Sequence, residues 1–75
     1  MPAVVVYWLD AHADANGWTD ITELDLEPRR IQSCGFLLDP VKPDHVSLAQ
    51  SVDGPNVDQV IHIPRVNVIR IRPLQ

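Results

Sequence analysis

Five aromatic and basic residues have the side chains best suited to bind a ligand or a partner. Aromatic rings dominate both subunit interfaces and the pockets that stack planar ligands. Guanidinium groups hold phosphate through two parallel hydrogen bonds, so a few of them together form an anion site. The sequence therefore predicts that binding of a ligand or partner involves Trp18, Tyr7, Arg65, Arg70 and Arg72.

The same residues also have structural interpretations. Exposed arginines pair with surface carboxylates and keep an edge strand from aggregating. Trp18 follows Gly17 in a loop, where its ring could close one end of a small domain.

Metal binding and catalysis have weaker signals. Asp10, His12 and Asp14 alternate, so they would offer carboxylate and imidazole ligands to a divalent metal if the first strand continued through them. An acidic loop or a solvated strand edge gives the same spacing, so we expect no metal and no other cofactor. The sequence contains serines and histidines but no nucleophile-elbow motif, which a hydrolase of the Ser/His/Asp type would need. Its glycines are scattered singly and form no phosphate-binding loop. We therefore expect no catalytic residues and no enzymatic activity.

The elements that position these residues are predicted to be strands. In the last thirty residues, segments 45–52, 57–63 and 66–72 alternate apolar and polar side chains. Gly54-Pro55 supplies a hairpin turn between the first two, and Pro64 interrupts the ladder before the last.

Two further strands are predicted at 3–10 and 29–38. Gly35 marks a sharp bend of the second strand or a close approach of another backbone. The long acidic loop between the strands contains one short helical turn around 20–25, because Asp20 and Glu23 have the spacing of a capping box.

The first strand is apolar on both faces, because Val4, Val6 and Trp8 alternate with residues that are also apolar. One face belongs in the core, and the sequence leaves open which one. We predict that a second copy of the chain covers the other face, with Val4, Val6 and Trp8 as its contacts; a loop of the same chain is the alternative.

Composition limits the partners. A chain of 75 residues forms one domain, 1–75, which buries only about 60% of its unfolded surface, so we expect a homo-oligomer. Cys34 permits no intramolecular disulfide, which favours a cytoplasmic location. The net charge of −4 makes long nucleic acid an improbable partner. We find no signal sequence and no apolar run of about 20 residues, so we expect no association with a membrane.

The order of these elements resembles the five-stranded small barrel shared by Src-homology-3-like and Sm-like domains, in which a proline-bearing turn precedes the last strand. The resemblance implies an all-β, five-stranded small β-barrel with a long acidic first loop that contains one short helical turn. The glycine/asparagine ligand motif of RNA-binding Sm proteins is missing, and so is the aromatic set of proline-peptide binders. The resemblance therefore implies a fold and no ligand.

A second resemblance rests on short motifs spread along the chain. They are Trp8-x-Asp10-Ala11, Trp18-Thr19, Glu27-Pro28, Ser33-x-Gly35, Lys42-Pro43-x-His45-Val46-x-Leu48-Ala49-Gln50-Ser51 and Ile63-Pro64. This combination is similar to small uncharacterised proteins encoded by bacteriophages and prophages. It implies that the protein works in the cytoplasm of an infected bacterial cell.

Two functions fit these observations. The first is a non-enzymatic interaction or assembly module that oligomerises through its first strand and docks a protein partner through Trp18 and the acidic loop. The alternative is a protein that sequesters a small anionic ligand, a nucleotide signal of the host, and so counters host defence. A third, an Sm-like RNA-binding ring, is disfavoured by the negative charge and the missing motif.

Overall fold

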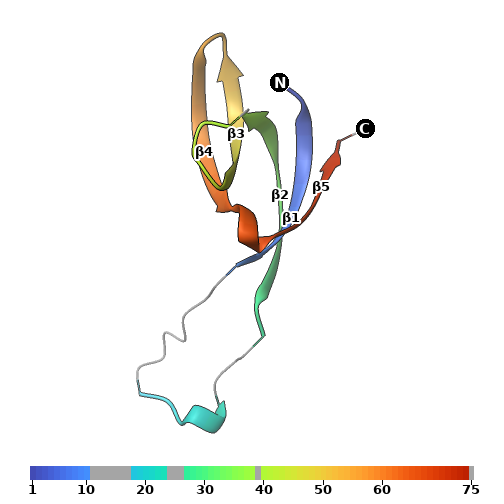
Figure 1. The fold of residues 1–75 in the computed structure, drawn as a ribbon. Coiled ribbons are helices and arrows are strands. Elements are labelled where there is room, and N and C mark those ends of the chain that lie inside the picture. The colour runs from blue at the N-terminus through green and yellow to red at the C-terminus, as the bar shows by residue number, and fades with distance from the viewer. Residues whose placement is uncertain (11–17, 24–26, 39, 75) are drawn as a thin grey trace.

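The computed structural model describes residues 1–10, 18–23, 27–38 and 40–74. These residues form five strands and two short 3-10 helices (Figure 1). In chain order the elements are β1 (Ala3–Asp10), η1 (Ile21–Glu23), β2 (Arg29–Leu38), β3 (His45–Asp53), β4 (Asn56–Pro64), η2 (Arg65–Asn67) and β5 (Val68–Pro73). The predicted all-β class is confirmed. Among the described residues, no helix has the length and apolar character needed to cross a membrane.

The strands form one antiparallel sheet in the order β4-β3-β2-β1-β5. Neighbours in sequence lie side by side except β5, which returns to pair with β1. This leaves β4 and β5 as the two edges (Figure 1). The predicted barrel requires a ladder between β4 and β5, and the described residues form none, so the antiparallel sheet is confirmed and its closure into a barrel is not.

Local backbone preferences explain where the C-terminal strands end. Gly54 has a φ of 57°, a conformation that glycine adopts without steric cost, and with Pro55 it joins β3 to β4 by a two-residue turn. Pro64 ends β4, and the single helical turn η2 connects it to β5. The predicted hairpin and the tight turn before the last strand are both confirmed.

The core lies on one face of the sheet and draws most heavily on β1. Its buried residues are Val4, Val6, Trp8, Val46, Leu48 and Ile63, with Ile31, Leu37 and Val68 packed against them. Val4, Val6 and Trp8, which we predicted as contacts with a second copy, are only 4%, 0% and 8% exposed in the single chain. They are core residues and leave little surface for another subunit.

The opposite face of β1 is also covered in part by the chain itself. Val5 is 5% exposed, and Cys34 of β2 and Arg72 of β5 are its partners in the neighbouring strands. A second subunit is therefore not needed to bury Val5.

Gly35 lies where β2 changes partner. Residues 29–36 of β2 pair with β1, and residues 36–38 pair with β3. A Cβ atom on Gly35 would lie 2.8 Å from the carbonyl oxygen of Ala49 and 3.2 Å from the Cβ of Leu48. The predicted close approach of another backbone is confirmed.

Gly35→Ala is expected to lower the free energy of unfolding by about 1–3 kcal/mol, because the new methyl group must push β2 and β3 apart. Urea denaturation followed by circular dichroism measures the loss. Cys34→Ala is the matched control, since Cys34 is exposed on the same strand, and we expect it to change stability by less than about 0.5 kcal/mol. Equal stability of the two variants would contradict the close approach.

The described part of the first loop contains the predicted helical turn as η1, which lies away from the strands (Figure 1). The Oδ1 atom of Asp20 accepts hydrogen bonds from the backbone N–H of Thr22 at 3.0 Å and from its hydroxyl at 2.9 Å. These bonds lower the pKa of the Asp20 carboxyl, the backbone bond most strongly. Residues 24 and 25, the end of the predicted turn, lie outside the described residues.

Candidate functional site

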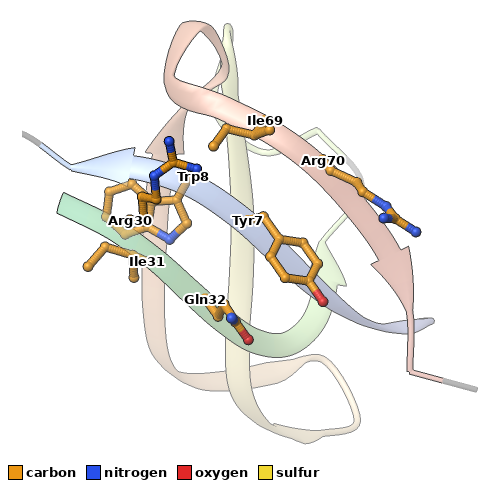
Figure 2. A pocket seen from close by; sticks show the side chains of 7 residues that line it. All are labelled: Tyr7, Trp8, Arg30, Ile31, Gln32, Ile69 and Arg70. Atoms are coloured by element: carbon orange, nitrogen blue, oxygen red, sulfur yellow. The ribbon is translucent and has the colours of Figure 1, made fainter. Parts of the chain in front are cut away.

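A pocket of about 330 Å³ lies between the three strands β1, β2 and β5 (Figure 2). Small-molecule sites in proteins start at about this volume, roughly 300 Å³. The pocket combines aromatic, aliphatic, amide and guanidinium groups. Its lining residues are Tyr7, Trp8, Arg30, Ile31, Gln32, Ile69 and Arg70.

The ladder register brings the polar half of the pocket together. Tyr7 is opposite Gln32 in β2 and opposite Arg70 in β5, so these three side chains form a row across one face of the sheet. Arg30 stands two residues from Gln32 and therefore shares that face. Arg30 pairs with Leu9 of β1.

A bulge in β5 brings two neighbouring residues of that strand into the same pocket. The β1–β5 register shifts between Tyr7 and Trp8, because Tyr7 pairs with Arg70 whereas Trp8 pairs with Val68. Ile69 is the extra residue on β5. Bulges bend a strand and redirect its side chains, which explains how Ile69 and Arg70 can line one pocket although they are neighbours in β5.

Trp8 contributes a small, fixed apolar part of the pocket wall. Its indole Nε1–H donates a hydrogen bond to the Oγ of Ser33 at 3.0 Å, and the side chain is 8% exposed. The indole N–H is thus already satisfied. The small exposed part of the ring offers a ligand only apolar contact.

The pocket is cationic within a chain of net charge −4. Arg30 and Arg70 are both exposed, and neither forms an ion pair with any other described residue. The described lining residues include no carboxylate. With respect to the described residues, the two guanidinium groups can therefore receive an anion from solution.

Arg72 supports the pocket from outside. Its Cζ atom lies 5.9 Å from the centre of the Tyr7 ring, a cation–π distance, and it shares a face of β5 with Arg70. It does not line the pocket. Its contact helps to fix the Tyr7 ring.

The five residues predicted to bind a ligand or partner do not form one site. Tyr7 and Arg70 line the pocket, and Arg72 lies beside it. Arg65 lines a separate cavity of about 110 Å³, where its guanidinium donates to the carbonyl of His45 at 3.5 Å. Trp18 is fully exposed and lines neither cavity.

Sequence reasoning missed Arg30 and Gln32 as pocket residues. Both are polar residues that alternate at the start of the second strand, which was the available signal. Their place opposite Tyr7 and Leu9 depends on the strand register, which the sequence does not show.

The structure also brings one serine close to a histidine. The Oγ of Ser47 and the Nδ1 of His62 are 2.7 Å apart on paired positions of β3 and β4. Ser47 is only 2% exposed, so a substrate has little access to its hydroxyl. The hydrogen bond follows from the direct pairing of the two residues across β3 and β4 and does not indicate a catalytic pair.

The predicted metal ligands fall largely outside the described residues. Asp10 ends β1 opposite Arg29, whereas His12 and Asp14 are not among the residues described. Within the described part of the chain, no three potential ligands converge on a metal site.

No protein-family model matches the chain, and no curated protein and no solved structure is significantly similar to it. The pocket geometry is therefore the basis for assigning a function.

Proposed function

We propose that the protein is a non-enzymatic binding protein that holds a small aromatic anion, best represented by a nucleotide, in the pocket between β1, β2 and β5. One observation carries this proposal: Arg30 and Arg70 line an otherwise aromatic and aliphatic pocket without an ion pair to any described residue. Arginine binds phosphate with two parallel hydrogen bonds, and aromatic rings stack on bases because every base has a π face.

The chemistry of the lining supports binding without catalysis. The described lining residues offer a phenol, an amide and two guanidinium groups, and they include no imidazole, carboxylate or thiol. These groups recognise shape and charge. They lack a general base whose pKa lies near neutral pH.

The experiment is a titration of AMP into a Trp18→Phe protein, followed by intrinsic fluorescence. The chain has two tryptophans, so this variant leaves Trp8, in the pocket wall, as the only indole reporter. We expect a saturable change in Trp8 fluorescence that weakens as salt is added, because the guanidinium–phosphate contacts are exposed and screened. An unchanged spectrum at millimolar AMP would contradict the proposal.

The resemblance to bacteriophage proteins suggests the biological setting of this proposal. A phage protein that retains a nucleotide signal in the bacterial cytoplasm would lower the free concentration of that signal. Because the ligand binds only the folded protein, it would also raise the free energy of unfolding of the protein.

A second candidate is an assembly module, favoured by the two open sheet edges. Unpaired edge strands are templates for pairing with another chain. Val57 and Ile61 of β4 and Ile71 of β5 are 41%, 39% and 38% exposed. The charges are complementary, because β4 carries Asp58 and β5 carries Arg70 and Arg72. We propose that β4 of one copy pairs with β5 of the next.

The charged side chains of the two edge strands lie on the same face of the sheet, which supports this pairing. Asp58 pairs with Ser51, so it shares the face of Ser47, opposite to the core residue Leu48. Arg72 pairs with Val5 and also lies on the face away from Val4 and Val6. Paired edges would therefore place Asp58 and the arginines on the same side of a continuous sheet.

Asp58→Arg is expected to weaken self-association about tenfold or more, since like charges would meet across the paired edges. Sedimentation velocity at several concentrations measures it. The double variant Asp58→Arg/Arg72→Asp should restore association, whereas Asp53→Arg makes the same charge change outside both edge strands and should have little effect. A monomeric wild-type protein, or equal effects of Asp53→Arg and Asp58→Arg, would exclude the assembly.

We also propose that the curved sheet corresponds to the small Sm-like or Src-homology-3-like barrel. The length of the last connection supports this, because the three residues of η2 join strands on opposite edges of the sheet. So short a link requires the sheet to curl until the end of β4 lies near the start of β5.

A further inference from the structure

We infer that the ligand carries two separate anionic groups, one held by Arg30 and the other by Arg70, and one planar group that contacts the aromatic lining. This inference rests on the proposed function and concerns the chemical class of the ligand. It follows from where the two arginines lie around the pocket.

The two arginines approach the pocket from opposite sides of β1. Arg30 belongs to β2 and is opposite Leu9, whereas Arg70 belongs to β5 and is opposite Tyr7. They are thus two strands apart across the sheet and two residues apart along it. With about 4.8 Å between strands and about 3.4 Å per residue, their Cα atoms are separated by about 12 Å.

The two side chains also lie at different ends of the pocket. Figure 2 shows Arg30 at the Trp8 end of the pocket and Arg70 at the other end, beyond the Tyr7 ring. Each guanidinium has five N–H donors in a planar fork that suits an anion of its own. A ligand with one terminal anion would satisfy one fork and leave the other unused.

The middle of the pocket suits a planar, apolar group. In Figure 2 the Tyr7 ring lies between the two arginines, and Trp8, Ile31 and Ile69 add apolar surface to the same lining. Gln32, opposite Tyr7, adds an amide with both donors and an acceptor. An amide of this kind can pair with the edge of a base. A nucleoside with phosphates at two positions of its sugar combines two separate anionic groups with one planar base.

Two isomeric probes separate this ligand class from others. Adenosine 3′,5′-bisphosphate carries its phosphates at two positions, whereas ADP carries both in one chain at the 5′ position. We expect the bisphosphate to bind about tenfold or more tightly than ADP, because only the bisphosphate reaches both guanidinium groups with charge-assisted bonds. AMP serves as the ligand with one phosphate.

Arg30→Gln tests which residue gives the preference. It should reduce the affinity for the bisphosphate about tenfold, to that of AMP on the wild-type protein. Arg29→Gln is the matched control: Arg29 is an exposed neighbour that does not line the pocket, so the preference should remain.

Equal affinities for the two isomers, or equal effects of Arg29→Gln and Arg30→Gln, would overturn the two-anion inference while AMP binding still supported the pocket. Absence of binding by all three probes would overturn both the inference and the proposed function.

Discussion

Val6→Asp is expected to leave the chain unfolded at room temperature. Val6 is 0% exposed in the core and lies on β1, which is paired on both sides, with Ser33 of β2 and Ile71 of β5 opposite it. A carboxylate there would be buried in the apolar core cluster of Val4, Trp8 and Leu48. Such changes cost about 4 kcal/mol or more, which is comparable with the stability of about 4–11 kcal/mol expected for 75 residues.

Circular dichroism and a thermal melt measure this effect. Val66→Asp is the matched control, because Val66 lies in η2 and is 92% exposed. It should melt within a few degrees of the wild-type protein. A cooperative melt of Val6→Asp near the wild-type temperature would show that β1 is not at the centre of the core.

Arg70→Glu is expected to reduce AMP affinity about 100-fold or more, which is the largest functional effect predicted. The change removes one of the two guanidinium groups of the pocket and puts a carboxylate beside the bound phosphate. A hydrogen bond to a charged group contributes about 1.5–3 kcal/mol, and repulsion by the new carboxylate adds to that loss. Arg70 is exposed, so the fold should be unaffected.

The Trp8 fluorescence titration measures this change, with Arg65→Glu as the control. Arg65 carries the same charge but lines the separate, smaller cavity. We expect Arg65→Glu to retain AMP binding within about threefold, since only a long-range, screened charge is altered. Equal losses in the two variants would show that net charge, and not the pocket, controls binding.

The strands could be predicted from sequence because their signals are local. Alternating side chains, the Gly54-Pro55 turn and the interruption at Pro64 act through the preferences of a few neighbouring residues. Each strand begins and ends within two residues of its predicted bounds. Gly35 was informative for the same reason, since a missing side chain in mid-strand indicates a close approach.

The pocket could not be predicted because it depends on register. Tyr7, Gln32 and Arg70 come from three segments, and only the pairing of β1 with β2 and β5 aligns them. The bulge at Ile69 then shifts the alignment by one residue. A single extra residue in a strand changes which face the following side chains occupy, and no local pattern shows it.

The first strand shows a further limit of pattern reasoning. Two apolar faces suggested that a second copy covers one of them, yet Val4, Val5 and Val6 are all buried in one chain. The bending of the sheet decides how much of each face is covered. Bulges and mid-strand glycines bend strands at single positions, but how far a face is covered depends on the whole sheet.

The most direct test of ligand binding is the ¹H–¹⁵N correlation spectrum of the labelled protein with and without AMP. The chain has two indole N–H groups, one on Trp8 in the pocket wall and one on the exposed Trp18. Binding in the pocket should shift the Trp8 indole signal and the amide signals of Gln32 and Arg70, and leave the Trp18 signal in place. A shift of Trp18 without Trp8, or an unchanged spectrum at millimolar AMP, would contradict the proposed pocket.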